Sequence, residues 1–346
     1  MPELPEVETV RRVLAAHLPG RVIAGVRCRR ADVLAGRSPE EFAGRVTGGR
    51  FVRVGRRGKY LLLWVEHPGG SDRPAPGRAA GPAGAPGDSQ VAPVLIVIHL
   101  RMTGRLTVAR RGDPLPPHTH VVFHLAADGD PVSPGGWDEL RFSDTRRFGR
   151  LYLLDPRAVA GVVAAAEWGD HPPPVPAGRR AGTAGGASSP ASPPDAPRGL
   201  LELGPEPLGR RFGPGFLARR LAGRRAPIKA ALLDQRVVAG LGNIYADEAL
   251  FRARIDPRRA AGSLTPGELG RLVRAIRAVL RDALSAGGTT FSDYRDGLGR
   301  EGGFAPRLAV YGRAGQPCRR CRTPIATVRL AGRTTHFCPS CQEGTA

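Results

Sequence analysis

Four cysteines near the end of the sequence constrain its fold more than any other feature. They are spaced as Cys318-x2-Cys321-x16-Cys338-x2-Cys341, and two such pairs supply four thiolates for one tetrahedral structural zinc ion. Two disulfides are the alternative, which a reducing cytosol disfavours. Because four thiolates fill the coordination shell, we expect the metal to shape a hairpin and to take no part in chemistry.

The charge of the chain points to its class of partner. Its 346 residues include 52 lysines and arginines against 31 acidic residues, a formal net charge of +21. Such an excess favours a polyanion, and we expect nucleic acid. No membrane is expected, because no apolar run approaches the roughly 20 residues of a spanning helix. The acidic, proline-rich start also differs from a secretory signal, so a cytoplasmic location is expected.

Lysine, asparagine and methionine are almost absent, although arginine is abundant. The chain has only Lys59, Lys229, Asn243 and, apart from Met1, only Met102. So strong a bias suggests that the few lysine, asparagine and methionine residues that remain have chemical roles. Lysine, unlike arginine, can lose its proton or act as a compact point charge. A solvated charge at Lys59 and simple core packing at Met102 are the open alternatives.

The first three residues, Met1-Pro2-Glu3, predict a nucleophile at the N-terminus. Removal of Met1 gives Pro2 a secondary amine, and an α-amino group has a pKa of about 7.7–8.0, so a fraction of it is nucleophilic at neutral pH. Glu3 could move protons beside it. The apolar spacing over 6–18 predicts an amphipathic helix that would fix this start. The alternative is that proline is simply common at position 2.

The pattern along the chain predicts a β region followed by a helical region. Short apolar runs at 51–54, 60–65, 94–100, 120–125 and 150–154 predict a sandwich or barrel. Two stretches rich in Pro, Gly, Ala and Ser, about 68–93 and 169–199, predict disordered loops.

After residue 200 we expect helices over 227–235, 244–253 and 265–284. A capping box from Thr265 to Glu268 opens the last of them. The glycine-rich turn before Asn243 would present backbone amides to phosphate, although an ordinary capping turn explains it too. The glycine-rich segment 292–306 is expected to be mobile.

These motifs together resemble those of the bacterial formamidopyrimidine-DNA glycosylases, which remove oxidised purines such as 8-oxoguanine. The matching stretches are MPELPEVETVRR, GRRGKYLLL, HLRMTGRL, DTRRFG, LGPEPL, IKAALLDQRVVAGLGNIYADEALF, GGTTFSDY, VYGRAGQPC and the cysteine pairs. The resemblance implies an α+β fold: an N-terminal β-sandwich with flanking helices, a helix–two-turns–helix domain and a zinc-finger hairpin. The expected divisions are a catalytic domain 1–157, a linker 158–199, a helical domain 200–306 and a finger 307–346.

The resemblance also implies a role for individual residues. Pro2 would attack C1′ and form a Schiff base, Glu3 would donate a proton, Lys59 would assist β-elimination, and Arg333 would serve δ-elimination. The expected partner is double-stranded DNA with oxidised bases or abasic sites, bound by a monomer and with the damaged nucleotide flipped out. The expected DNA contacts are His118, Arg146, Arg147, Arg224, Lys229 and Asn243. The residues expected to fill the gap left by the flipped base are Met102, Arg146 and Phe148, and 292–305 matches the loop that closes over the lesion.

Two alternative functions remain at this point. A sister branch excises oxidised pyrimidines and shares the N-terminal proline, the helical module and the finger; Leu4 and the complete set of Met102, Arg146 and Phe148 favour the purine branch. A non-catalytic DNA-binding protein would be expected to have lost Pro2, Glu3 or Lys59, and the sequence has all three.

Overall fold

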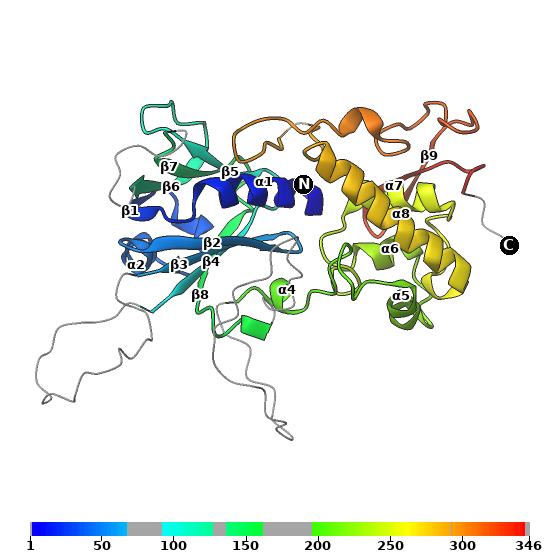
Figure 1. The fold of residues 1–346 in the computed structure, drawn as a ribbon. Coiled ribbons are helices and arrows are strands. Elements are labelled where there is room, and N and C mark those ends of the chain that lie inside the picture. Colours follow the sequence, from blue (N-terminus) through cyan, green and yellow to red (C-terminus); the bar gives the residue numbers. More distant parts are fainter. Residues whose placement is uncertain (1, 68–91, 127–135, 162–195, 292, 343–346) are drawn as a thin grey trace, which may run out of the picture. The chain divides into compact units, whose positions relative to one another are not determined.

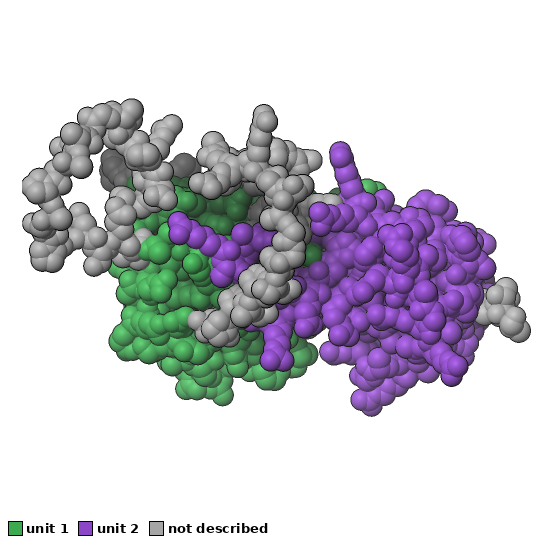
Figure 2. Space-filling view, turned by 90° about the horizontal axis from the view of Figure 1, so that it is seen from below, with its two compact units in different colours: residues 1–156, 281–307 green, residues 157–280, 308–346 purple. Residues whose placement is uncertain are grey.

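The computed structural model describes residues 2–67, 92–126, 136–161, 196–291 and 293–342. Most of the two stretches expected to be disordered, 68–93 and 169–199, therefore lies outside the described residues. The chain forms two compact units, which Figure 2 distinguishes by colour. Unit 1 comprises Met1–Pro156 and Arg281–Arg307, and unit 2 comprises Arg157–Leu280 and Leu308–Ala346.

Unit 1 is built on one antiparallel sheet that folds into two layers. Its strands are β1 (Val22–Cys28), β2 (Arg50–Arg57), β3 (Tyr60–Glu66), β4 (Val94–His99), β5 (Gly104–Ala109), β6 (Thr119–Ala126), β7 (Glu139–Asp144) and β8 (Arg150–Leu154). The strand order is β5-β7-β6-β1-β2-β3-β4-β8. Strands β1 and β2 share only the pair Val22 and Arg50, so the sheet separates there into two four-stranded halves.

The two halves face each other across one core, as expected for a β-sandwich (Figure 1). Phe51 of β2 and Phe123 of β6 meet edge to face with ring centroids 6.5 Å apart, a favoured aromatic geometry. Helix α1 (Leu4–His17) packs against β2 and β3 of one layer and β5 of the other. Its buried residues Val7, Val10 and Leu14 belong to the same core. The expected amphipathic helix is therefore present and fixes the start of the chain to the sandwich.

The remaining elements of unit 1 are short. They are the 3-10 helix η1 (Ala31–Val33), the helix α2 (Pro39–Val46) and the 3-10 helix η3 (Ala305–Arg307). Ser38 caps α2, because its hydroxyl accepts the backbone N–H of Glu41 at 3.1 Å.

Unit 2 consists of short helices and a terminal hairpin. Its elements are α4 (Arg198–Leu201), α5 (Pro214–Leu221), α6 (Ile228–Leu233), α7 (Asn243–Ala253), η2 (Ala261–Ser263), most of α8 (Pro266–Ser285), β9 (Ala326–Leu330) and β10 (Arg333–Phe337). The capping box of α8 forms as expected, since Thr265 N donates to Glu268 Oε2 at 2.8 Å. The β9–β10 turn is Ala331-Gly332, both with positive φ, as a tight two-residue hairpin requires.

The unit boundary falls inside α8, which the sequence pattern assigns wholly to the helical domain 200–306. Residues from Arg281 onward belong to unit 1. Hydrogen bonds hold this returning segment: Thr289 N donates to Glu6 Oε1 at 2.8 Å, and Val108 N donates to Gly297 O at 2.9 Å. Among the described residues no helix is long and apolar enough to cross a membrane.

Candidate active site and metal centre

The N-terminal residues are held rigidly at the start of α1. Pro2 and Glu3 are both buried. Glu3 occupies the N-cap position, where it and Glu6 form a capping box, and Glu3 N donates to Glu6 Oε2 at 2.8 Å. A capping box satisfies backbone N–H groups that a helix start otherwise leaves without partners. The secondary amine expected at Pro2 is therefore attached to a fixed helix end.

The carboxylate of Glu6 joins this helix end to the segment that returns from α8. Its second oxygen accepts the N–H of Thr289, and the hydroxyl of Tyr294 donates to the Glu6 carbonyl at 3.3 Å. Burial, followed by the charge of Glu6, raises the pKa of Tyr294, so its hydroxyl stays protonated as a donor. Sequence reasoning did not identify Glu6, although its spacing from Glu3 is that of a capping box.

Lys59 lies at the tip of the β2–β3 hairpin. Arg57 pairs with Tyr60, so Gly58 and Lys59 form a two-residue turn, and Gly58 has a φ of 56°. A glycine at this position is favoured in tight hairpin turns. Lys59 is largely buried. It is thus presented by a short turn that leaves its backbone little freedom.

His99, on the neighbouring strand β4, is neutral. His99 pairs with Tyr60 in the sheet, and their rings meet edge to face at 4.6 Å. Burial first, then the charges of Arg101 and Lys59, lowers the pKa of His99 to about 3. Its Nδ1 accepts the N–H of Arg101 at 3.0 Å. The structure therefore places Lys59 beside an uncharged ring.

Met102, Arg146 and Phe148 lie on two neighbouring turns of unit 1. Arg146 Nη1 lies 3.7 Å from Met102 Sδ. Met102 is 37% exposed and Phe148 51%, although both are large apolar residues. Exposed apolar side chains next to a cation are the combination that wedges between bases. The structure thus brings Met102 and Arg146 into contact.

One buried carboxylate, Asp144, shapes both turns. Its oxygens accept the N–H groups of Arg146 at 3.2 Å and Gly149 at 2.7 Å, and Thr103 Oγ1 donates to it as well. A Cβ at Gly149 would lie 2.7 Å from the ring of Phe142, so only glycine fits there. Sequence reasoning missed the role of Asp144 in joining the two turns, because Thr103 of the other turn lies 41 residues away in the sequence.

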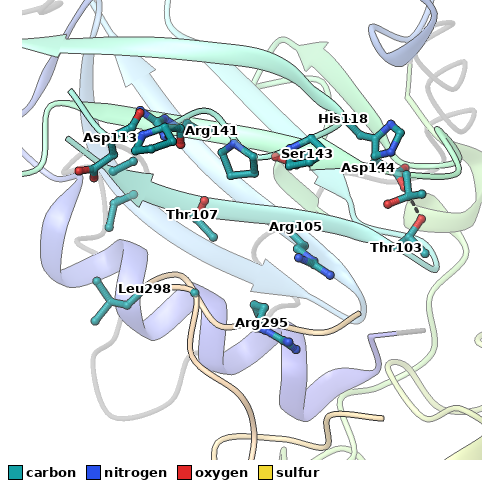
Figure 3. Close-up of a pocket in the computed structure, with 17 residues that line it drawn as sticks. Thr103, Arg105, Thr107, Asp113, His118, Arg141, Ser143, Asp144, Arg295 and Leu298 are labelled. Atoms are coloured by element: carbon teal, nitrogen blue, oxygen red, sulfur yellow. Dashed lines mark hydrogen bonds between the residues drawn. The ribbon is translucent and has the colours of Figure 1, made fainter. Parts of the chain in front are cut away.

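His118 lines a cavity of about 450 Å³ in unit 1 (Figure 3). Arg105, Arg295 and Asp144 line the same cavity, and Figure 3 shows His118 close to Asp144. His118 has a φ of 61°, in the left-handed region that non-glycine residues seldom adopt. Arg147, which has a φ of 55°, is exposed, with Nη1 3.5 Å from Asp32 Oδ2.

Two of the expected residues of unit 2, Arg333 and Asn243, lie at the terminal hairpin. Arg333 is the first residue of β10 and is exposed. Asn243, the first residue of α7, donates from Nδ2 to Thr334 O at 3.1 Å. Arg224 lies apart from them, 3.5 Å from Asp234. The first turn of α7 is therefore tied directly to the strand that carries Arg333.

Lys229 has a different environment from the one expected. Its side chain is 0% exposed, and Nζ lies 2.6 Å from Asp247 Oδ1. Nζ also donates to Thr335 Oγ1 at 2.8 Å and Thr334 O at 3.1 Å. This placement leaves no exposed amine for the direct DNA contact that the sequence resemblance implies at Lys229. The ammonium instead holds β10 against α6 and α7.

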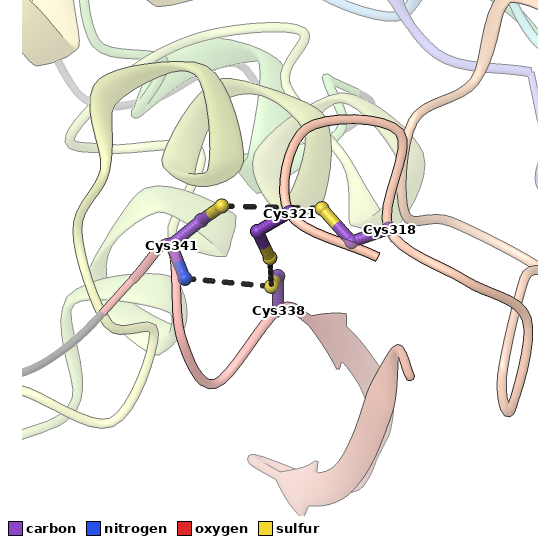
Figure 4. A group of neighbouring side chains, drawn as sticks. All are labelled: Cys318, Cys321, Cys338 and Cys341. Carbon is purple, nitrogen blue, oxygen red and sulfur yellow. Dashed lines mark hydrogen bonds between the residues drawn. The ribbon is translucent and has the colours of Figure 1, made fainter. Parts of the chain in front are cut away.

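The four cysteines of unit 2 come together as their spacing predicts (Figure 4). Their sulfur atoms all lie within 4.8 Å of one another, with Cys318 and Cys341 3.9 Å apart and Cys321 and Cys338 3.4 Å apart. A disulfide needs about 2.05 Å, whereas four thiolates at about 2.3 Å from one zinc ion are about 3.8 Å apart. The geometry fits a tetrahedral structural zinc and not two formed disulfides.

Three family models match the chain. Residues 1–151 match the formamidopyrimidine-DNA glycosylase N-terminal domain, and 203–295 match the formamidopyrimidine-DNA glycosylase H2TH domain. Residues 315–344 match a zinc finger found in FPG and IleRS, and together with the clustered cysteines this match confirms the zinc.

Curated relatives are similar along their whole length. The formamidopyrimidine-DNA glycosylase of Symbiobacterium thermophilum is 44% identical over 100% of this chain and 92% of its own. That of Pelotomaculum thermopropionicum is 39% identical over 99% of both chains.

Solved structures share the fold. The MutM (FPG) protein of Thermus thermophilus has a TM-score of 0.70 at 37% identity, covering 100% of both chains. A Lactococcus lactis FPG mutant in complex with Fapy-dG containing DNA has a TM-score of 0.74 at 28% identity, covering 99% of this chain and 100% of the other. The wild-type Lactococcus lactis protein has also been solved with DNA containing an oxidised pyrimidine, at a TM-score of 0.73, 28% identity and the same coverage.

Proposed function

Because the chain belongs to the formamidopyrimidine-DNA glycosylase family, we propose that it is a bifunctional glycosylase and lyase of duplex DNA. It excises oxidised purines, 8-oxoguanine and formamidopyrimidines, and then cleaves the strand by β,δ-elimination. The observation that carries the proposal is the fixed placement of Pro2 and Glu3, which the buried Glu6 carboxylate holds at the start of α1.

The reaction begins at the amine of Pro2, once Met1 is removed. Its nitrogen forms a bond to C1′ of the damaged nucleotide while the bond from C1′ to the base breaks. The electron pair of that bond leaves with the base, which takes up a proton. The nitrogen, cationic after the attack, gives up its N–H proton, and its lone pair then breaks the bond from C1′ to O4′. This opens the sugar ring and leaves a cationic iminium between Pro2 and C1′. Glu3, adjacent in the chain, supplies the proton at the sugar.

Strand cleavage follows from the iminium. The cation acidifies the protons on C2′, so loss of one of them expels the 3′ phosphate, and a second elimination expels the 5′ phosphate. Lys59 assists the first elimination as a local cation at the phosphate. Arg333, exposed on β10, serves the second. Each elimination breaks one C–O bond, and the phosphate leaves with its electron pair.

The base must leave the stack before Pro2 can reach its sugar. Met102 and Phe148 fill the space that it vacates, and Arg146 faces the unpaired base opposite. Apolar wedges of this kind offset an unstacking cost of a few kcal/mol. Further contacts to the DNA come from His118, Arg147, Arg224 and Asn243, while the zinc ion holds the hairpin that carries Arg333. The reaction takes place on the chromosome in the cytoplasm.

Duplexes that each carry one defined lesion opposite each of the four bases test the proposal. We expect rapid release of 8-oxoguanine and formamidopyrimidines paired with cytosine, together with strand cleavage. The second candidate function is excision of oxidised pyrimidines, which the DNA complex of the Lactococcus lactis protein favours. Faster release of oxidised pyrimidines than of oxidised purines would support that function and contradict the first.

A further inference from the structure

Helix α1 and the β2–β3 hairpin are joined by a cluster of charged residues around Glu8. Its carboxylate accepts hydrogen bonds from Arg56 Nε at 3.1 Å and from Arg11 Nε at 3.0 Å and Nη2 at 2.9 Å. Arg12 Nε adds one at 3.1 Å. The side chains of Glu8 and Arg56 are only 14% and 10% exposed. Water therefore screens their attraction less than it screens an ordinary surface pair.

Glu8 is charged whenever the protein is folded near neutral pH. Burial alone raises the pKa of Glu8, but the guanidinium groups of Arg56 and Arg11 outweigh that effect and lower it to about 2. The carboxylate is thus a charged anchor for Arg56 at neutral pH.

The other end of Arg56 reaches the turn that carries Lys59. Arg56 Nη1 donates to Gly58 O at 2.8 Å. That oxygen belongs to the planar peptide unit between Gly58 and Lys59. Fixing the oxygen fixes the plane, and hence the direction in which the Lys59 backbone leaves the turn. A guanidinium can make both bonds at once because its donors point in set, divergent directions.

We propose that Arg56 is a positioning residue for Lys59. Through Glu8 it ties the turn to α1, whose first turn carries Pro2 and Glu3. The three groups that share one reaction then keep their mutual placement during the elimination. This inference rests on the function proposed above for Lys59, and it adds a residue that acts through Lys59 without touching the DNA.

Arg11 provides a matched control. Within the described residues both hydrogen bonds of its guanidinium go to Glu8, so Arg11→Met removes an ion pair of Glu8 and leaves the bond from Arg56 to Gly58 in place. Arg56→Met removes both links. Arg56→Lys keeps the charge beside Glu8, but one ammonium cannot reproduce the divergent donors of the guanidinium.

The experiment measures single-turnover strand cleavage of a duplex with a pre-formed abasic site, at saturating enzyme. Arg56→Met should slow cleavage about tenfold, since small misplacements of catalytic groups cost at least that much. Arg11→Met should stay within about twofold of the parent, because an ion pair of this kind adds little beyond stability. Borohydride trapping at Pro2 should change less than cleavage in Arg56→Met. The cleavage rate of Arg56→Lys should lie between those of Arg56→Met and the parent. If Arg56→Met does not fold, Arg56→Lys is tested in its place.

A double-mutant cycle separates positioning from a general structural role. If Arg56 acts through Lys59, Arg56→Met/Lys59→Met should cleave no more slowly than Lys59→Met alone, within about twofold. The inference would be overturned if the losses of cleavage rate in Arg56→Met and Lys59→Met multiplied in the double variant. Equal losses in Arg11→Met and Arg56→Met would overturn it as well. A normal rate for Lys59→Met would instead refute the role proposed for Lys59. In that case a tenfold loss in Arg56→Met would also show that Arg56 acts by another route.

Discussion

Lys229 and Asp247 form an ion pair at 2.6 Å in which neither side chain is exposed. The other oxygen of Asp247 accepts the N–H of His336 at 2.9 Å. One helix, α7, therefore fixes the finger hairpin through Asp247, and Lys229 neutralises the carboxylate that does so. Charge is tolerated in this interior only because the two groups compensate each other.

Removal of Lys229 alone should be more damaging than removal of the pair. Lys229→Met leaves the Asp247 carboxylate buried without a counter-charge, which typically costs about 3–5 kcal/mol of the free energy of unfolding. Lys229→Met/Asp247→Asn removes the stranded charge and should regain at least half of that loss, as urea unfolding would show. If the double variant is no more stable than Lys229→Met, the pair does not act as a unit.

Loss of zinc should weaken DNA binding strongly before it affects the β-sandwich. The metal joins Cys318, Cys321, Cys338 and Cys341, all in unit 2, whereas the sandwich has its own core in unit 1. Stripping with a chelator should lower the affinity for duplex DNA at least tenfold with little change in the β signal of circular dichroism. Active protein without zinc, measured by metal analysis, would contradict this expectation.

Met102 and Phe148 should matter for excision and much less for cleavage of a ready-made abasic site. Replacing both with alanine removes the wedge that offsets an unstacking cost of a few kcal/mol, and an abasic site has no base to extrude. Val52→Ala is a suitable control, since Val52 is 37% exposed like Met102 and lies on β2. Equal losses on the two substrates would mean that the pair only supports the fold.

Acid should destabilise the folded chain through His99 first. The folded pKa of His99, about 3, lies below the unfolded value of about 6.5, so the unfolded state takes up the proton first. Stability should be complete above pH 6.5 and fall as the pH drops towards 3, by up to about 1.4 kcal/mol per pH unit. Glu8, with a folded pKa of about 2, adds to the loss only below about pH 4.5.

Urea unfolding at pH 6.5 and 4.5 isolates the contribution of His99. His99→Gln cannot take up a proton, so its stability should depend less on pH across this interval than that of the parent. The same pH dependence in both proteins would show that His99 is not the group responsible.

Local sequence signals predicted the elements that depend on neighbouring residues. The cysteine spacing predicted the metal site, because zinc prefers four thiolates. Thr265 and Glu268 predicted the start of α8, because the two residues of a capping box lie close together in the chain. Strand β7 was not predicted, since it carries Glu139 and Arg141. These two form a buried ion pair at 2.7 Å, and Arg141 also donates to the carbonyls of the 110–114 segment.

The unpredicted parts of the site depend on partners that are distant in sequence. Glu6 meets Thr289 only because the chain returns to unit 1 after α8. The rarity of lysine suggested a role for Lys229, but only the fold places Asp247 against it. The roles in DNA binding and catalysis follow from the family resemblance.

The identity of the nucleophile is tested most directly by trapping the reaction with borohydride. Hydride reduces the iminium to a stable amine and so links the protein to lesion-bearing DNA. Lys59 and Lys229 are the only side-chain amines in the chain, and Lys229 is buried in its ion pair, so peptide mapping has few sites to distinguish. We predict that the DNA is attached to the nitrogen of Pro2, and that protein retaining Met1 folds normally but does not trap. DNA attached to Lys59, or base release with no trapped complex, would contradict the proposed mechanism.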